Sequence, residues 1–369
     1  MIKVGITGQN GFIGSHLYNY LGLQEGIELV RFEKSSFDSP SLLEDFITKC
    51  DTIVHLAAMN RHEDPQVIYD TNVNLVNRLI DGCKRTGSTP HIIFSSSSQE
   101  AADNLYGQSK LKGRSNLEEW AAVSGAKLTG MVIPNVFGPF GKPFYNSVVA
   151  TFCYQLTHGQ VSTINVDGDL KLIYINELVS EIYHLIKTSI TGKIVVAHSK
   201  EIKVSEILSL LKSYKTEYLE KGIFPNLDNA FEKALFNTFR CFIPKEHYPL
   251  LLKNNMDNRG NFIEIARTNS SGQFSFSTTH PNITRGNHFH TRKAERFAVI
   301  KGKAKIALRK IDDDTVIEYF LDGDQPAFVD MPIWHTHNIT NIGEGELLTL
   351  FWINEPYNSD DPDTYFVNV

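Results

Sequence analysis

Three glycines spaced three residues apart follow the first apolar run of the chain, and they constrain its fold more than any other feature. The run Ile2–Ile6 has the length and composition of a buried strand. Gly8, Gly11 and Gly14 come directly after it. The apolar pattern of Ser15–Leu23 then predicts a helix. A strand, a glycine turn and a helix in this order begin a strand–helix–strand unit, from which parallel sheets are built.

The first hundred residues repeat this unit. Further apolar runs follow at Glu28–Phe32, Thr52–Leu56 and His91–Phe94, with amphipathic stretches between them. This alternation is typical of an α/β domain, and it predicts a doubly wound parallel sheet with helices on both faces.

The pattern changes in the last third of the chain. Short alternating runs such as Arg296–Ile300, Lys303–Leu308 and Leu347–Ile353 are separated by glycine, aspartate and proline. These features predict an all-β barrel or jelly roll. Residues 241–261 are rich in proline and asparagine and form a plausible junction. We therefore expect one domain over residues 1–243 and a second over residues 247–369.

Composition narrows the classes of function. The net charge is −6 and no basic run stands out, which disfavours nucleic-acid binding. The four cysteines are widely spread and are more typical of apolar packing than of disulfides or metal ligands. A strand pattern starts at Ile2, and no apolar run reaches the roughly 18 residues of a membrane span. We expect a cytosolic (cytoplasmic) protein with no membrane partner.

The glycine turn predicts a dinucleotide site in a Rossmann-type domain. Gly8 permits the tight turn, Gly11 lets a pyrophosphate approach the backbone, and Gly14 allows close packing of the helix on the sheet. The helix N-terminus then faces the phosphates. We expect the cofactor to contact Gly8, Asn10, Gly11, Phe12, Ile13 and Gly14.

The end of the second strand pattern bears on the choice of cofactor. An acidic side chain there binds the ribose 2′-hydroxyl of NAD, whereas arginine favours the 2′-phosphate of NADP. Arg31 comes first and Lys34 close behind, so we expect NADPH. Glu33 argues for the other cofactor, and a solvated cluster of charges is the alternative interpretation.

Several further motifs resemble the extended short-chain dehydrogenase/reductases, many of which act on nucleotide sugars. Residues 55–58 read HLAA, residues 106–110 form a YxxxK pair, and residues 134–139 read PNVFGP. The resemblance covers about residues 1–240. It implies that Leu56, Ala57 and Ala58 border the cofactor and that Asn135 binds substrate.

Tyr106 and Lys110 then carry the chemistry. Tyr106 would give a proton to a carbonyl oxygen as hydride arrives at its carbon, and Lys110, one helical turn away, would lower the phenol pKa and hold the ribose. A serine hydroxyl should hold the substrate oxygen. Alignment on Phe94 favours Ser97, with Ser96 a close second, although either could be a loop-capping group. Only eight residues separate Ser97 from Tyr106, so the loop is shorter than in relatives.

A second constellation lies in the β-rich part. His288 and His290 are two residues apart and would face one side of a strand. Glu295 follows them, and His337 comes much later. Three imidazoles and one carboxylate suit zinc or another borderline divalent metal. The alternative is a group of hydrogen-bonded polar residues. The spacing HxH, x4, E, x6, G, then P, x4, H, x3, N resembles the two cupin motifs, which implies a cupin jelly roll.

A narrower resemblance is to the dTDP-sugar 3,5-epimerases of the cupin superfamily. Residues 257–264 read DNRGNFIE and residues 285–288 read RGNH. In that family the histidine removes a proton beside a 4-keto group and a lysine stabilises the enolate. Here Glu295 occupies the lysine position, which suggests that a metal replaces the lysine cation.

This resemblance implies that Arg259 and Arg285 bind substrate. If His288 is a metal ligand it is not the free base, and His335 is then a modest candidate for that base. A structural metal with a closed fourth position is the alternative.

The two halves together resemble bifunctional enzymes of capsular polysaccharide synthesis. That resemblance implies a UDP-2-acetamido-2,6-dideoxy-4-hexulose substrate, epimerised at C3 and reduced at C4 to UDP-N-acetyl-6-deoxy-L-talosamine, a precursor of UDP-N-acetyl-L-fucosamine. A reductase with a structural or dimerisation barrel and a non-catalytic NADPH sensor are the alternatives. We expect a homodimer or higher homo-oligomer.

Overall fold

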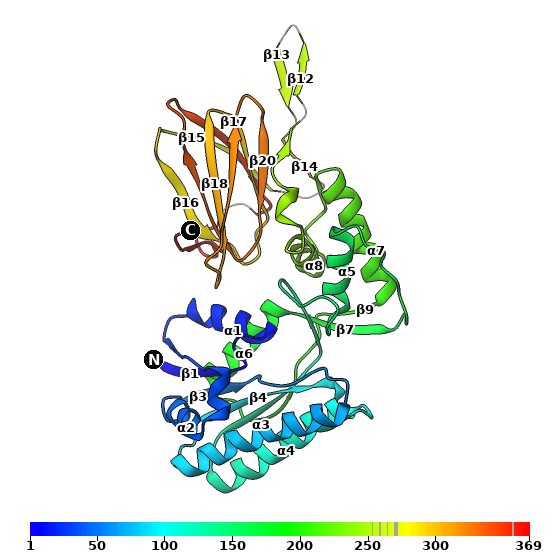
Figure 1. The fold of residues 1–369 in the computed structure, drawn as a ribbon, viewed down its shortest axis with the longest axis vertical. Helices are drawn as coiled ribbons and strands as arrows, with labels where there is room; N and C mark the ends of the chain where they lie inside the picture. Colours follow the sequence, from blue (N-terminus) through cyan, green and yellow to red (C-terminus); the bar gives the residue numbers. More distant parts are fainter. Residues whose placement is uncertain (253, 258–259, 264, 269–271, 356–357) are drawn as a thin grey trace. The chain divides into compact units, whose positions relative to one another are not determined.

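The packing divides the chain into two compact units, Met1–Thr151 with Val166–Val204, and Phe152–Asn165 with Ser205–Val369. The computed structural model describes residues 1–252, 254–257, 260–263, 265–268, 272–355 and 358–369 (Figure 1).

The first unit is built on a six-stranded sheet, in the order β2-β1-β3-β4-β5-β8, whose neighbouring strands all pair in parallel. Its strands are β1 (Ile2–Thr7), β2 (Ile27–Val30), β3 (Thr52–His55), β4 (His91–Ser97), β5 (Leu128–Ile133) and β8 (Gly192–Val195). The strand order reverses between β1 and β3, and ligands of such sheets bind at the carboxyl ends of the strands flanking this point. The predicted parallel α/β sheet is confirmed.

Helices cover both faces of this sheet, with α1 and α6 on one side and α2, α3 and α4 on the other (Figure 1). The helical elements are α1 (Phe12–Gly22), η1 (Lys34–Asp38), α2 (Pro40–Thr48), α3 (Pro65–Thr86), η2 (Ser98–Ala101), α4 (Leu105–Ser124) and α6 (Ile175–Thr188). A smaller sheet holds β6 (Asn135–Phe137), β7 (Asp169–Tyr174) and β9 (Lys200–Lys203).

The sequence of α3 shows how these layers form. Asp64 accepts a hydrogen bond from the Gln66 amide at 2.8 Å and caps the helix, and Pro65 opens it. Val76, Leu79, Ile80 and Cys83 recur at helical spacing and are buried in the core beneath the sheet. Apolar burial of this kind contributes about 25 cal/mol per Å².

The second unit contains two antiparallel five-stranded sheets, in the orders β11-β20-β17-β22-β15 and β19-β18-β21-β16-β23. Their strands are β11 (Leu250–Leu251), β15 (Gln273–Thr279), β16 (Thr284–Phe289), β17 (Glu295–Lys301), β18 (Lys303–Lys310), β19 (Val316–Asp322), β20 (Ala327–Met331), β21 (His335–Asn341), β22 (Leu347–Ile353) and β23 (Tyr365–Phe366). Side chains of both sheets share one apolar core that includes Val299, Ile306, Val329 and Ile339. The predicted all-β architecture is confirmed, and the jelly-roll assignment stays a prediction.

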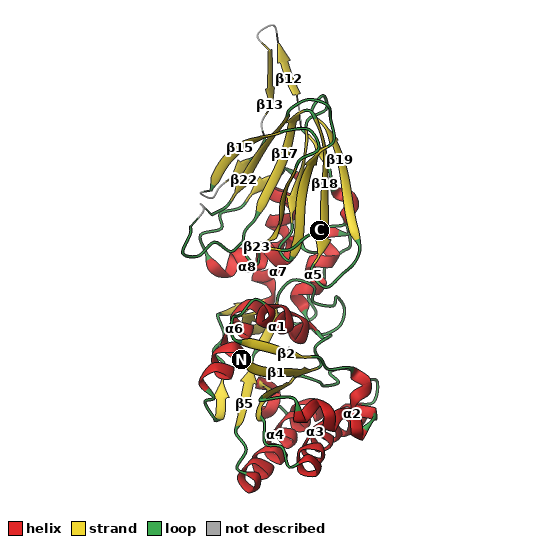
Figure 2. Ribbon diagram, turned by 90° about the vertical axis from the view of Figure 1, so that its left-hand side faces the viewer, coloured by secondary structure: helices red, strands yellow, loops and turns green. Residues whose placement is uncertain are grey.

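Short pairs of strands complete this unit: β10 (Ile223–Phe224) with β14 (Arg267–Thr268), and the hairpin of β12 (Asn254–Asp257) and β13 (Gly260–Ile263) (Figure 2). The remaining helical elements are α5 (Val148–Thr157), α7 (Val204–Tyr214), the π-helix η3 (Lys215–Glu220), α8 (Ala230–Arg240) and η4 (Lys245–His247). Among the described residues, no helix is both long and apolar enough to cross a bilayer.

Aromatic side chains join the helical segment after Val204 to the β-sheets. The ring of Phe224 lies 4.1 Å from that of Trp352, and the ring of Phe236 contacts Tyr218 at 4.9 Å. This segment therefore packs with the β-sheets of the second unit, whereas the domain boundary expected between residues 243 and 247 stays a prediction.

Candidate functional site

The glycine turn between β1 and α1 lies against the end of β3. Gly8 has a φ of +76°, and a Cβ there would lie 2.8 Å from the Ala57 amide nitrogen. A Cβ on Gly14 would lie 2.1 Å from the Gly8 carbonyl oxygen, and the Gly11 amide donates to that same oxygen at 2.9 Å. Larger side chains at Gly8 or Gly14 would therefore force the turn apart.

The turn and the chain after β3 form one edge at the point where the strand order reverses. The Leu56 amide donates to the Thr7 carbonyl at 3.1 Å, and the Ala57 amide donates to the Thr7 hydroxyl at 3.4 Å. Residues 56–58 are half-buried beside the turn. Asn10 is exposed, and Phe12 and Ile13 begin α1.

This edge fits a dinucleotide. The residue that precedes α1, Gly11, has no side chain to cap the helix, so the first backbone N–H groups of α1 are available to a pyrophosphate. Beyond β2, the Arg31 side chain is 78% exposed and lies 3.4 Å from the Glu33 carboxylate. The Phe32 amide donates to the Gln9 side chain at 3.1 Å, which ties this end of β2 to the glycine turn.

Tyr106 and Lys110 lie in the first turns of α4. Asn104 caps the helix by accepting from the Gly107 amide at 2.8 Å. The Lys110 ammonium donates to the Ser95 carbonyl at 2.9 Å and lies 5.9 Å from the centre of the Tyr106 ring. Burial lowers the pKa of Lys110 to about 8. Burial also raises the pKa of Tyr106, with a smaller opposing effect from the Ser97 hydroxyl, so the phenol keeps its proton at neutral pH.

The two candidate serines have different partners. The Ser97 hydroxyl lies close enough to the Tyr106 phenol to lower its pKa, and it accepts from the Gln99 amide at 3.2 Å. The Ser96 hydroxyl donates to the Glu100 carboxylate instead. Ser97 therefore lies beside the proton donor, while Ser96 belongs to a neighbouring ion-pair network.

That network was not found from the sequence. Glu100 in η2 and Arg114 in α4 form a paired contact at 2.8 and 3.1 Å, and their side chains are only 7% and 9% exposed. The Lys193 ammonium lies 3.4 Å from Glu100. The pair fastens the short loop after β4 to the helix that carries Tyr106. Glu100 and Arg114 come from separate elements and share no motif, so no spacing signal marks them.

Asn72 was also not predicted as a site residue, and it connects the chain after β3 to α4. The buried Asn72 side chain accepts from the Met59 amide at 2.7 Å and donates to the Ser109 hydroxyl at 3.0 Å. Its place in an Asn-Val-Asn motif was the available sequence signal.

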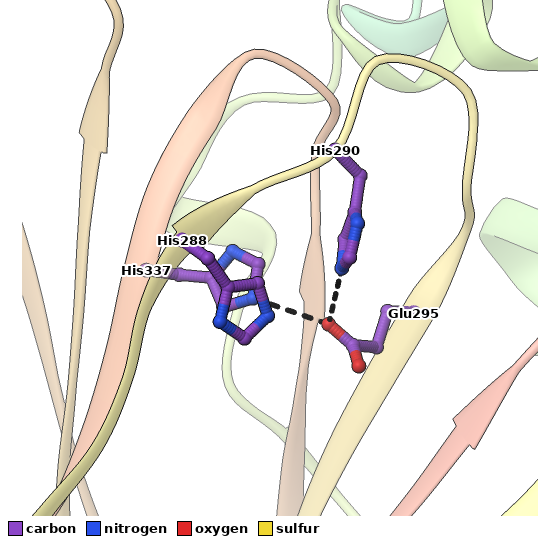
Figure 3. Close-up of side chains that lie close together, drawn as sticks. All are labelled: His288, His290, Glu295 and His337. Atoms are coloured by element: carbon purple, nitrogen blue, oxygen red, sulfur yellow. Dashed lines mark ion pairs between the residues drawn. The ribbon is translucent and has the colours of Figure 1, made fainter. Parts of the chain in front are cut away.

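The histidine and glutamate set lies in the second unit. His288 is in β16, His290 follows that strand, Glu295 begins β17 and His337 is in β21. One ligand atom from each of these four residues lies within 4.8 Å of the other three (Figure 3). The Glu295 carboxylate is 3.1 Å from His337 Nε2 and 3.4 Å from His290 Nε2. The structure thus brings the four predicted ligands together.

Backbone carbonyls orient these rings. His290 Nδ1 lies 2.5 Å from the Asp363 carbonyl, and His337 Nδ1 lies 3.1 Å from the His335 carbonyl. The opposite ring atoms, Nε2 of His290 and of His337, are buried without a hydrogen-bond partner among the described residues, as is Glu295 Oε2. A tetrahedral zinc site requires ligand atoms that point toward one another and have no other partner, on rings whose second nitrogen is held by a hydrogen bond.

Electrostatics favour the ligand forms of His288 and Glu295, whereas the Glu295 carboxylate outweighs burial and raises the pKa of His290. Burial, followed by repulsion from His337, lowers the pKa of His288 to about 4. Burial opposes ionisation of Glu295, but the imidazoles of His290 and His337, whose Nε2 atoms lie 3.4 and 3.1 Å from the carboxylate, outweigh it and hold the carboxyl pKa well below its usual range. Neutral imidazole and ionised carboxylate are the states that bind a metal.

The other predicted residues lie elsewhere. Asn135 is exposed at the start of β6, Arg285 is exposed on β16, and Arg259 lies outside the described residues. His335 is not one of the four clustered residues; its Nδ1 lies 3.0 Å from the Ile333 carbonyl, and its ring lines a different cavity with Tyr248. The proposed roles of these four residues stay predictions.

Comparison with known proteins finds a family match for each of the two parts of the chain. Residues 4–197 match the NAD dependent epimerase/dehydratase family, and residues 255–365 match the polysaccharide biosynthesis C-terminal domain. The chain is 33% identical to the UDP-2-acetamido-2,6-beta-L-arabino-hexul-4-ose reductase of Pseudomonas aeruginosa, over 100% of this chain and 99% of that protein.

Solved structures show the same relationship. The capsular polysaccharide assembling protein CapF from Staphylococcus aureus is 35% identical, with a TM-score of 0.64 over 100% of both chains. The P. aeruginosa protein RMD, solved with NADPH, is 22% identical with a TM-score of 0.53 over 58% of this chain and 83% of its own, which shows the fold alone. The chain therefore belongs to the NAD dependent epimerase/dehydratase family and, over its whole length, to the CapF-type proteins that add a polysaccharide biosynthesis C-terminal domain.

Proposed function

We propose that this protein is a bifunctional nucleotide-sugar enzyme of capsular polysaccharide synthesis. Its C-terminal unit, as a cupin jelly roll, would epimerise a UDP-2-acetamido-2,6-dideoxy-4-hexulose at C3. Its N-terminal unit would then reduce the C4 ketone to UDP-N-acetyl-6-deoxy-L-talosamine. The observation that carries the proposal is the presence of two separate reactive sets, Tyr106 with Lys110 and the four-residue cluster, on a chain similar to a UDP-sugar reductase over its full length.

The reductase half follows from the geometry around α4. NADPH, when bound at the glycine turn, supplies the hydride. Tyr106 is protonated and gives its proton to the oxygen at C4, and the Ser97 hydroxyl holds that oxygen beside the phenol. Lys110 is held against the Ser95 carbonyl, where its charge supports the negative charge that develops on the phenol oxygen. Arg31 is exposed and would have to exchange its contact with Glu33 for a 2′-phosphate.

The epimerase half follows from the acidity of carbon beside a ketone. A divalent metal such as zinc, held by His288, His290, Glu295 and His337, supplies a Lewis acid for the developing enolate oxygen. The chain's own part is to orient His290 and His337 through backbone carbonyls and to keep these two and Glu295 buried.

The two activities suit one chain because both act on the 4-keto group. Epimerisation is close to thermoneutral, whereas hydride transfer is effectively irreversible, so reduction draws the epimerised sugar forward. We further propose a cytoplasmic homodimer or higher homo-oligomer.

Two other functions would use the same fold. The barrel could be a structural or dimerisation module on a single-activity reductase, or the whole chain could sense NADPH without turnover. The orphaned buried ligand atoms support a bound metal in this unit, and only a metal that acts on the enolate fits the proposed epimerisation.

The test is to incubate the metal-loaded protein with a UDP-4-keto-6-deoxy-N-acetylhexosamine in D2O without NADPH. Loss of the C3 proton signal in the NMR spectrum is expected, because enolisation exchanges that proton with solvent. NADPH is then added, and its oxidation should follow. An unchanged C3 signal with normal NADPH oxidation would instead identify a reductase with a structural barrel, and no reaction at either stage would favour a sensor.

The two serines provide a matched pair for the reductase site. Ser97→Ala should lower kcat for reduction by about 10-fold or more, because it removes a hydrogen bond made at the reacting oxygen. Ser96→Ala should leave kcat within a few-fold of wild type and act on stability instead, since Ser96 bonds to Glu100. Steady-state NADPH oxidation and thermal melting of both variants measure this, and the reverse order of effects would assign catalysis to Ser96.

A further inference from the structure

A group of buried charges lies between the helical segment and the β-sheet of the second unit. Arg296 in β17 pairs with Asp330 in β20 at 2.7 and 3.0 Å. The hydroxyl of Tyr218 also donates to Asp330, as does that of Tyr248 at 3.1 Å. The Asp330 carboxylate is therefore saturated and its charge is matched by Arg296.

Arg240, the last residue of α8, adds a second buried cation to this group. Its side chain is 4% exposed, and its Nη2 donates to the Met331 carbonyl at 2.7 Å. Its Nη1 has no hydrogen-bond partner among the described residues. The guanidinium also lies 5.9 Å from the centre of the Tyr218 ring.

The charges of this group do not balance. Two guanidinium groups face one carboxylate, and the tyrosines do not supply the missing negative charge. Burial, with the nearby charge of Asp330, raises the pKa of both Tyr218 and Tyr248 above the ordinary range of a phenol. Burial disfavours the Arg240 cation because it removes hydration, but Tyr218 and Asp330 outweigh burial and raise the Arg240 pKa, so two charged guanidinium groups share one carboxylate.

A cavity opens beside Arg240. Its lining includes Arg240, Cys241, Lys245, Tyr248, Asp330 and His335. Asp330 is the one carboxylate among the lining residues, and it is already paired. The space in which the centre of a water molecule fits has a volume of about 80 Å³. Because roughly 10–15 Å³ of such space holds one water, there is room for a small ion of several heavy atoms.

We propose that this cavity is a binding site for one small oxyanion, a phosphate or a small carboxylate, paired with Arg240. The Arg240 guanidinium donates to the anion, and Lys245, an exposed residue on the lining, adds positive charge. The cavity is far smaller than the roughly 300–1,000 Å³ of sites for larger ligands, so it does not take a nucleotide sugar. The site is separate from the four-residue cluster, none of whose side chains lines the cavity.

The proposal is tested on the full-length, metal-loaded protein by thermal melting in phosphate and in acetate, with NaCl holding the ionic strength constant. At millimolar anion, a rise in Tm of roughly 2–4 °C is expected, the shift that a ligand above its Kd produces in a unit of this size. The anion that gives the larger rise distinguishes phosphate from carboxylate. No rise with either anion would overturn the proposal.

Variants locate the effect. Arg240→Met removes the cation, and Ile243→Trp fills the cavity from its lining while Arg240 is retained. Both should lose the rise, whereas Arg309→Met, a partly exposed arginine of the same unit, should keep it. If Arg240→Met fails to fold, Ile243→Trp alone decides. A rise that persists in either cavity variant would place the anion at another site and overturn the proposal. Crystals grown with selenate should show an anomalous peak in the cavity beside the Arg240 guanidinium.

Discussion

Replacement of Tyr106 by phenylalanine is expected to lower NADPH-dependent reduction of the 4-keto sugar by about 10²–10⁴-fold, the usual contribution of a positioned general acid. The phenol is the protonated group beside Lys110 and Ser97, and phenylalanine keeps its ring but not its proton. The measurement is kcat from NADPH absorbance at pH 7, where Lys110, with a pKa of about 8, still carries its charge.

Two controls make this result specific. Tyr183 lies on α6, and its ring packs against that of Tyr20. Tyr183→Phe removes a hydroxyl group outside the reductase site and should leave kcat unchanged. The Kd for NADPH of Tyr106→Phe should rise only slightly, since the glycine turn and the end of β3 are intact. Exchange of the C3 proton in D2O should persist in Tyr106→Phe. A Tyr106→Phe variant with wild-type kcat would show that the proton comes from another group.

The parts of the site that were predicted from the sequence are those written in short, continuous segments. Gly8, Gly11 and Gly14 follow a strand within seven residues, so their backbone requirements could be deduced before any tertiary contact was known. The metal ligands come from three segments, but strand geometry still links them: His288 and His337 are register partners on β16 and β21.

Contacts between distant elements were not predictable in this way. Glu100 and Arg114 look like surface charges in sequence, and only the packing of η2 on α4 buries them. The helical stretch before Arg240 showed no readable chemistry, yet it places that arginine against β20. His335 is not one of the four clustered residues and lines the cavity beside Arg240, and its role as the base stays a prediction.

The separation of the two reactive sets has a consequence for the order of reaction. Tyr106 and His290 belong to different compact units, so each can be inactivated without removing the side chains of the other set. If the enzyme works in two steps, one variant should lose only reduction and another only epimerisation, and the two together should restore the whole reaction. A reductase with a structural C-terminal unit should not behave in this way.

His290→Ala is expected to abolish C3 proton exchange, with a loss of metal affinity above the roughly 10–100-fold that follows removal of an outer-shell hydrogen bond. His290 Nε2 is one of the orphaned donors facing Glu295, and alanine leaves the cluster with three ligands. Metal content by mass spectrometry and C3 exchange by NMR measure the two effects. His280→Ala, an exposed histidine outside the cluster, should retain both metal and exchange.

Mixing the two inactive variants gives the decisive result. Tyr106→Phe should still epimerise the 4-keto sugar, and His290→Ala should still reduce the epimerised product that Tyr106→Phe releases. The mixture is therefore expected to recover formation of the final UDP-sugar, although neither variant forms it alone. If His290→Ala by itself forms the wild-type product at the wild-type rate, the barrel takes no part in catalysis. If the mixture is no more active than its parts although Tyr106→Phe still exchanges C3, the epimerised sugar does not leave the enzyme, and the two steps are coupled within one molecule.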